Sequence, residues 1–173
     1  MLLDEWRKFK GFAVLEYFLW NGEKIHIKGL ARLLEISPNT AADVSSTLRE
    51  GGILNREEAG NIALYGSSGN STVAELKRMY ILLRISKYAK SFVEENKNIS
   101  SLILYGGTAR GEYDRNSDVD LLAISQSKSP EPKGIRAMEA GLGREVKIEV
   151  LGLGELRKLA DKKDTLYVKR SLN

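Results

Sequence analysis

Apolar residues recur at helical spacing over the first twenty positions of the chain. They fall on one face at 3.6 residues per turn: Trp6, Phe9, Ala13, Tyr17 and Trp20. Asn21-Gly22 supplies a stop signal directly afterwards. The pattern predicts one amphipathic helix that ends at this point.

The stretch up to about Ser68 predicts further short elements. These are a strand at 25–27, helices over 28–36 and from 38 to Gly51-Gly52, and strands at 53–58 and 61–65. Ser37 can cap the last helix, with Pro38 in its first position. Ala59-Gly60 lies between the two final strands, which indicates a hairpin.

A long helix is predicted after a flexible break at residues 68–71. Thr72 and Glu75 form a capping-box pattern at its start. From Leu76 to Val93 apolar residues cover most of the circumference, so the helix is expected to be buried on several sides. It would lie between two domains or in a homodimer interface.

From Ser100 onward, predicted strands alternate with helices. Strands are expected at 102–105, 119–124 and 146–151, and helices at 108–113, 135–142 and 155–172, with a polar loop at 126–133. The predicted fold class is therefore α+β. It comprises a small N-terminal domain (1–68), a connecting helix (69–98) and a small α/β domain with a mixed sheet (99–173).

Composition adds several limits to this picture. The 173 residues are 42% hydrophobic and 29% charged and include no cysteine, which is typical of a globular protein without disulfides or thiolate metal sites. No stretch is apolar enough to span a bilayer, so a cytoplasmic protein without membrane contact is expected. The net charge of +4 is unevenly spread: 1–70 carry −1, 71–99 carry +3 and 100–173 carry +2.

Gly106-Gly107 stands where a predicted strand turns into a helix. Two glycines let the backbone approach a ligand closely, and the free N–H groups of a helix start favour phosphate oxygens. Such a pair also serves as an ordinary turn. The residues alone leave both interpretations open.

Asp118 and Asp120 lie two residues apart at a predicted strand, so both carboxylates point to one face, about 6–7 Å apart at Cα. They repel each other unless a positive group lies between them, and a divalent cation meets that need. A solvated strand end is the alternative. Glu149 faces away from the apolar residues of a later strand and could join them if the strands are neighbours. Glu145 is a less central candidate.

The segment "YGGTARGEYDRNSDVDLLAI" resembles the signature of minimal nucleotidyltransferases in the polymerase-beta superfamily. Gly106-Gly107, ten intervening residues and Asp118-x-Asp120 match the glycine turn, the spacing and the acidic pair of that family. The resemblance covers residues 100–151. It implies that Asp118, Asp120 and Glu149 are catalytic and hold two Mg²⁺ (or Mn²⁺) ions on a nucleoside triphosphate.

The resemblance also implies contacts to the triphosphate from Gly106, Gly107 and Thr108 at the helix start. Arg110 would help to hold phosphate, or would form an ion pair with Asp114. The family usually has Ser at the position of Gly107, so one hydroxyl donor is missing, and Glu149 is one methylene longer than the commoner Asp.

The element order over residues 1–68, including "GLARLLEISPNTAADVSSTLREGGIL", resembles a winged helix-turn-helix. The resemblance makes duplex DNA a candidate partner. The candidate contacts are Lys28, Arg32, Asn39, Thr40, Ser45, Arg49 and Arg56. Phosphate contacts need Lys or Arg, and this segment carries net charge −1, so protein docking or dimerisation is an equal alternative.

These features predict a metal-dependent enzyme that transfers a nucleoside monophosphate, AMP from ATP, to an unidentified acceptor. Antitoxin members of the family modify a protein partner, which makes a protein acceptor plausible by resemblance. The alternative is a DNA-binding regulator whose second domain senses nucleotide without catalysis. A docking protein without either activity is a third hypothesis. His26, the single histidine, has no histidine partner for a metal site.

Overall fold

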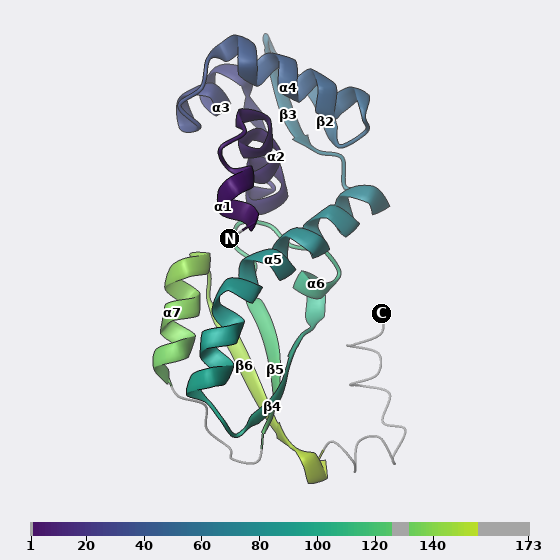
Figure 1. Ribbon diagram of the computed structural model, residues 1–173. Coiled ribbons are helices and arrows are strands. Elements are labelled where there is room, and N and C mark those ends of the chain that lie inside the picture. Colours follow the sequence, from purple (N-terminus) through teal and green to yellow (C-terminus); the bar gives the residue numbers. More distant parts are fainter. Residues whose placement is uncertain (1, 126–131, 156–173) are drawn as a thin grey trace. The chain divides into compact units, whose positions relative to one another are not determined.

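The computed structural model describes residues 2–125 and 132–155, which divide into two compact units (Figure 1). Unit 1 comprises Met1–Tyr80 together with Tyr113–Arg115, and unit 2 comprises Ile81–Glu112 and Asn116–Asn173. The division falls inside a helix. The connecting helix expected over 69–98 therefore contributes residues to both units.

Unit 1 has the element order of a winged helix-turn-helix. Its elements are α1 (Leu2–Trp6), α2 (Lys10–Asn21), β1 (Ile25–His26), α3 (Ile27–Leu33), α4 (Pro38–Glu50), β2 (Leu54–Ala59), β3 (Ile62–Ser67) and the first part of α5 (Ser71–Glu95). The three strands form an antiparallel sheet in the order β1-β3-β2. The helix-turn-helix and its hairpin wing are confirmed.

The prediction of a single N-terminal helix from the periodicity is wrong, because the helix is interrupted between α1 and α2. Phe9, in the break, is 68% exposed. Nearby, Nε of Arg7 donates to a Glu16 carboxylate oxygen at 2.8 Å, and the Tyr80 hydroxyl donates to the same oxygen at 2.5 Å. The hydrogen bond with Glu16 is the main cause that raises the pKa of Arg7 above its ordinary value. The hydrogen bond from Tyr80 to Glu16 could not be predicted from periodicity, which compares only residues close together in the sequence.

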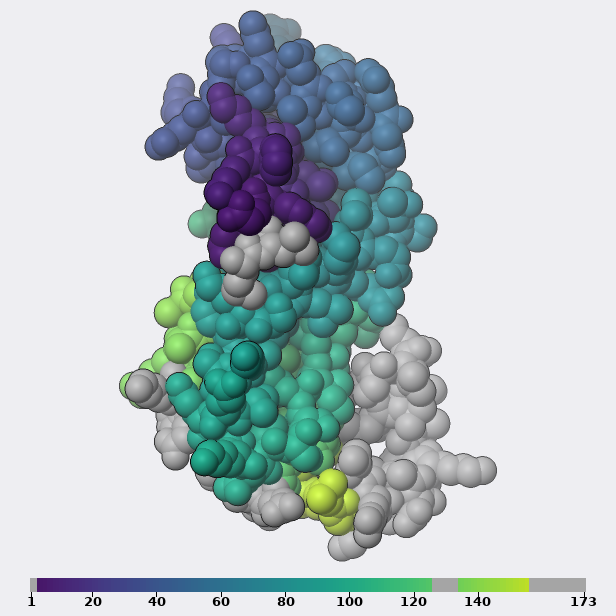
Figure 2. Space-filling model, in the orientation of Figure 1, coloured from purple at the N-terminus to yellow at the C-terminus, as the bar shows by residue number. Residues whose placement is uncertain are grey.

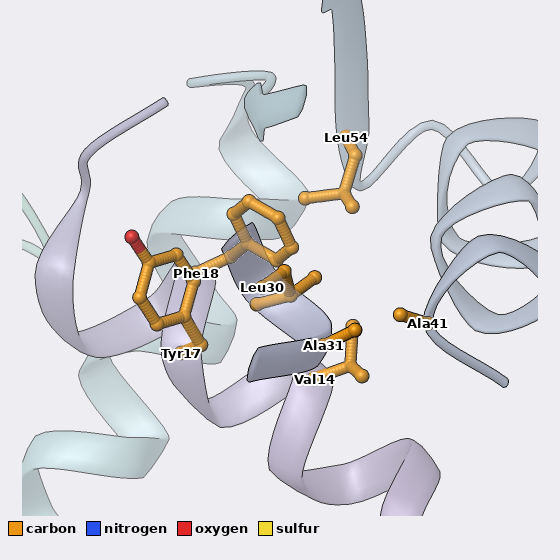
Figure 3. Close-up of a cluster of buried hydrophobic side chains, with 7 residues drawn as sticks. All are labelled: Val14, Tyr17, Phe18, Leu30, Ala31, Ala41 and Leu54. Carbon is orange, nitrogen blue, oxygen red and sulfur yellow. The ribbon is translucent and has the colours of Figure 1, made fainter. Parts of the chain in front are cut away.

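The core of unit 1 joins side chains from α2, α3, α4 and β2. Figure 3 shows its buried members: Val14, Tyr17, Phe18, Leu30, Ala31, Ala41 and Leu54. Ser45 of α4 is also fully buried, and its hydroxyl meets no hydrogen-bond partner in the part of the chain that the structure describes. The recognition-type helix α4 therefore turns a polar residue inward.

Side-chain caps start the helices of the helix-turn-helix. Oγ of Ser37 accepts the N–H of Thr40 at 3.0 Å, as the sequence predicts. At α3, Nδ1 of His26 accepts the N–H of Gly29 at 2.9 Å. Histidine is not among the usual capping residues, so this role was not foreseen.

The long helix α5 begins differently from the expectation. Asn70, not the Thr72–Glu75 pair, caps it: Oδ1 of Asn70 accepts the Val73 N–H, and its Nδ2 donates to the Gly52 carbonyl, both at 2.9 Å. The helix is only partly buried, since Met79 is 46% and Leu82 55% exposed. The teal atoms of α5 accordingly form part of the surface in Figure 2. Within residues 2–125 and 132–155, neither α5 nor any other helix is long and apolar enough to cross a membrane.

Tyr113–Arg115 belongs to unit 1 although its chain neighbours belong to unit 2. Tyr113 is 4% exposed, and its hydroxyl donates to the Lys77 carbonyl at 3.0 Å. Nζ of Lys77 donates in return to the Tyr113 carbonyl at 2.5 Å. The N–H of Arg115 donates to the Asn21 carbonyl at 3.0 Å. These bonds tie the segment to α2 and α5.

Unit 2 contains a three-stranded mixed sheet with β5 in the centre (Figure 1). Its elements are β4 (Ile99–Leu104), α6 (Gly106–Ala109), β5 (Val119–Ser125), α7 (Pro132–Leu142) and β6 (Val146–Gly152), with the second part of α5. β4 pairs antiparallel and β6 parallel with β5, so the predicted α+β class with a mixed sheet is confirmed. The helix expected at 155–172 and most of the polar loop at 126–133 lie outside the described residues.

The turn after β4 favours glycine at position 106 for two reasons. Gly106 has φ +72°, a conformation that other residues rarely adopt. A Cβ at this position would also lie 2.8 Å from Oδ2 of Asp120. Gly143 has a similar φ, +67°, but a Cβ there would meet nothing within 4 Å.

Replacing Ser45 by alanine is expected to raise the free energy of unfolding by about 1 kcal/mol, because a buried hydroxyl without a partner costs about 1–3 kcal/mol. Midpoints of urea unfolding, followed by far-UV circular dichroism, measure the change. Ser46→Ala is the control, since Ser46 is partly exposed and its hydroxyl donates to Glu50 at 3.1 Å. A loss of stability in Ser45→Ala would contradict the expectation.

Gly106→Ala is expected to destabilise the protein more than Gly143→Ala. The left-handed conformation costs about 1–2 kcal/mol with a Cβ present at either position, and at Gly106 the Asp120 carboxylate must also move away from the new Cβ. Thermal unfolding of both variants gives the difference. Equal losses would show that Asp120 does not constrain this turn.

Candidate functional site

The two aspartates expected to bind metal lie at the start of the central strand. Asp118 directly precedes β5 and Asp120 is its second residue, so both side chains leave the same face of the sheet. Both are partly buried. Since β4 is antiparallel and β6 parallel to β5, the end of β4 and the beginning of β6 flank this point.

Hydrogen bonds from four surrounding positions fix the backbone of the aspartate pair. Two of the partners, Arg144 and Glu145, lie on the β6 side of β5. The other two, Tyr105 and Thr108, lie on the β4 side. The bonds are Arg144 Nη1 to the Ser117 carbonyl (3.0 Å), the Thr108 hydroxyl to the Asp118 carbonyl (2.8 Å), the Val119 N–H to the Glu145 carbonyl (2.9 Å) and the Tyr105 N–H to the Asp120 carbonyl (3.1 Å).

The structure places the glycine turn against this pair. Gly106 lies so close to Asp120 that a Cβ would come within 2.8 Å of its carboxylate. Gly107 closes the next turn, because its carbonyl accepts the N–H groups of Arg110 at 3.0 Å and Glu112 at 2.9 Å. A Cβ on Gly107 would lie 3.1 Å from the Glu112 carbonyl oxygen, which is tight. Gly106 and Asp120, fourteen positions apart in the sequence, thus meet at one end of the sheet.

Thr108 and Arg110, expected to contact phosphate, have protein partners. The Thr108 side chain is 3% exposed and its hydroxyl is donated to Asp118, so it positions the acidic strand. Nε of Arg110 donates to a Glu112 carboxylate oxygen at 2.8 Å. The expected alternative to phosphate binding, an ion pair, is therefore present, with Glu112 in place of Asp114.

Lys147 lies beside the aspartate pair, and no role was predicted for it. It lies opposite Asp120 in the β5–β6 register, and its ammonium group donates a hydrogen bond to the Asp118 carboxylate. That bond, followed by the negative charges of Asp118, Glu145 and Asp120, raises the pKa of Lys147 above its ordinary value. Lys147 is therefore a cation within the acidic site at neutral pH.

Glu149 lies on the same face of the sheet but one step further from the pair. β6 neighbours β5, as expected, and Glu149 lies opposite Leu122 while Lys147 takes the place opposite Asp120. Among the residues that the structure describes, no three acidic or histidine side chains are grouped closely enough to hold a metal ion. Two carboxylates nevertheless fit a Mg²⁺ ion, which keeps water ligands and takes the rest from substrate phosphates.

The candidate DNA-contacting residues of unit 1 are not equally placed. Ser45 is fully buried in α4 and faces the core, so the expectation that it contacts DNA is corrected. Arg56 pairs with Glu58 at 2.6 Å, and the Thr40 hydroxyl shares a hydrogen bond with Ser37 at 2.8 Å. Three further side chains are exposed: those of Lys28 and Arg32 in α3 and of Asn39 in α4. Arg49 is exposed as well, and its guanidinium lies 4.0 Å from a Glu50 carboxylate oxygen.

Two solved structures share some similarity with the chain. A homodimeric winged helix-turn-helix DNA-binding domain from Mycobacterium bovis, described as a possible ArsR-family transcriptional regulator, is 22% identical. The match covers 47% of this chain and 80% of that chain, with a TM-score of 0.36. TrmBL2, an archaeal chromatin protein described as showing a novel mode of DNA binding, is 13% identical, over 95% and 71% of the two chains, with a TM-score of 0.29. Both scores are too low to assign a function.

Comparison with curated proteins gives no significant match. Comparison with protein families gives one assignment: residues 85–170 match the family described as nucleotidyltransferase domain. The matched range includes the glycine turn, the aspartate pair and β6. The C-terminal half of the chain thus belongs to the nucleotidyltransferase domain family, and a winged helix-turn-helix precedes it.

Proposed function

We propose that the chain transfers a nucleoside monophosphate, AMP from ATP, to a hydroxyl group of a protein acceptor, and that Asp118, Asp120 and the Gly106-Gly107 turn bind the nucleotide. The observation that carries the proposal is the close approach of Gly106 to the Asp120 carboxylate. A glycine turn beside a pair of carboxylates on one strand face brings together the two kinds of group that a triphosphate and its cation need, backbone N–H donors and metal-binding oxygens.

The proposed reaction assigns a task to each part of the site. The backbone N–H groups of the glycine turn orient the β- and γ-phosphates, as helix starts and nests of N–H groups do. The acceptor oxygen forms a bond to the α-phosphorus and loses its proton, while the bond to the bridging oxygen breaks and pyrophosphate leaves with that electron pair. A bound Mg²⁺ or Mn²⁺ would neutralise charge on the phosphates and lower the pKa of the acceptor hydroxyl. Asp118 and Asp120 would hold the ion.

Thr108 and Arg144 are positioning residues, which act through the aspartates rather than on the reacting atoms. Each donates a hydrogen bond to a carbonyl next to the aspartates, at 2.8 Å and 3.0 Å. Both side chains are buried. They restrict the backbone that carries the two carboxylates, and transfer reactions depend strongly on such restricted geometry.

A DNA-binding regulator that senses nucleotide without transferring it is the second candidate. The observation in its favour is the winged helix-turn-helix itself, with Lys28, Arg32 and Asn39 exposed on α3 and α4. Lys and Arg would contact phosphates, and Asn can pair with adenine. In this case the aspartate pair would bind a nucleotide that alters DNA affinity.

The test of the enzymatic proposal uses ATP labelled at the α-phosphate, with Mg²⁺ or Mn²⁺, and the full chain alone or in a cell lysate. Label is expected on a protein band, and Asp120→Asn is expected to remove it, because the amide binds a divalent cation far more weakly. ATP labelled at the γ-phosphate should leave the Asp120-dependent band unlabelled, which excludes phosphorylation as its source.

Asp43→Asn is the matched control, since it makes the same chemical change on exposed α4. Label that persists in Asp120→Asn would contradict the enzymatic proposal. Absence of label together with duplex DNA binding that weakens with salt and survives Asp120→Asn would favour the regulator.

Gly107→Ser is expected to increase the transfer rate relative to Gly107→Ala. Both variants place a Cβ 3.1 Å from the Glu112 carbonyl oxygen, so they share the same steric effect. Only serine adds a hydroxyl donor, and a hydrogen bond to a charged group contributes about 1.5–3 kcal/mol. Initial rates of label transfer measure the difference. Equal rates would show that a hydroxyl at this position does not reach the phosphates.

A further inference from the structure

We propose that Lys147 is an exchanging cation of the nucleotide site: its ammonium group binds Asp118 before nucleotide binds, and moves to a phosphate oxygen of the nucleotide when a divalent cation binds Asp118. The inference rests on the proposed function and adds one side chain to it. Neither the comparisons with known proteins nor the sequence motif assigns a role to Lys147.

The position of Lys147 follows from the strand register. It lies opposite Asp120, on the side of β5 that faces β6, whereas Gly106 approaches Asp120 from the side of β4. The aspartate pair therefore lies between a backbone turn and a lysine. A triphosphate bound over the pair has N–H donors on one flank and an ammonium group on the other.

The charges around Lys147 explain why it rests on Asp118. Its ammonium group donates a hydrogen bond to Asp118, and Glu145 and Asp120 add further negative charge around it. Two neighbouring carboxylates repel each other when no cation is bound. Lys147 supplies the missing positive charge without closing the site, because its side chain remains 53% exposed and that of Asp118 35%.

Binding of a divalent cation changes this balance. The ion and the ammonium group are both positive and cannot share the Asp118 carboxylate without strong repulsion. The lysine stem has four rotatable carbons and one exposed end, so the group can leave. A nucleotide phosphate arriving with the ion offers a new anionic partner, and lysine is a common phosphate ligand.

The test measures two affinities in Lys147→Met and in the unaltered chain. The first is the affinity for Mn²⁺ without nucleotide, from the electron paramagnetic resonance signal of free Mn²⁺. The second is the affinity for a non-hydrolysable ATP analogue at saturating Mn²⁺, from calorimetry. Lys147→Met is expected to bind Mn²⁺ about tenfold more tightly, because a competing charge is removed, and the analogue about tenfold more weakly, because a phosphate contact is lost.

Opposite changes in the two affinities are the signature of exchange. A residue that only supports the fold would weaken both when it is replaced, and that result, or no change in either affinity, would overturn the inference. Lys147→Arg keeps the charge and should not tighten Mn²⁺ binding. Lys90→Met, on the exposed side of α5, removes a lysine elsewhere and should change neither affinity.

Failure of the proposed function has a different outcome. If the unaltered chain binds neither Mn²⁺ nor the analogue, the nucleotide site itself is refuted, and with it the role of Lys147. If the unaltered chain binds both and Asp120→Asn abolishes binding, the site stands. The Lys147 variants then decide the exchange alone.

Discussion

The hydrogen bonds that converge on the backbone from Ser117 to Asp120 are the constraint on which the rest of unit 2 depends. Their partners are Tyr105 directly after β4, Thr108 of α6, and Arg144 and Glu145 directly before β6, so the central strand cannot shift without breaking contacts on both sides. Because β-strand side chains alternate, fixing this backbone also fixes the direction of both carboxylates. The glycine turn and Lys147 are then brought to the pair by strand pairing.

Local signals predicted much of the architecture. The Ser37–Pro38 start, the Gly22 stop and the hairpin around Gly60 are present in the structure. So is the predicted order of strands and helices up to β6, apart from the break between α1 and α2. Each depends on residues near each other in the sequence. The glycine turn and the Asp118–Asp120 pair were also visible, since a strand-to-helix turn and a two-residue spacing are local patterns.

The features that were missed depend on distant partners. The break after α1 is accompanied by bonds that link Arg7, Glu16 and Tyr80, and the true cap of α5 holds Gly52 as well as Val73. Ser45 looked like a surface residue because serine usually is one. At the candidate site, alternation placed Lys147 and Glu149 on one face, but only the register of β6 against β5 shows that the lysine stands opposite Asp120.

The docking of Tyr113–Arg115 among residues of unit 1 has a consequence for dissecting the protein. A single cut in the polypeptide, wherever it is made, leaves one unit without a piece of itself, because the chain leaves unit 2 and returns to it within three residues. The Lys77–Tyr113 bonds would be severed in either separated half. A fragment that ends after Tyr80 would therefore lack the Tyr113–Arg115 segment of unit 1, and the complementary fragment would carry that segment without its partners.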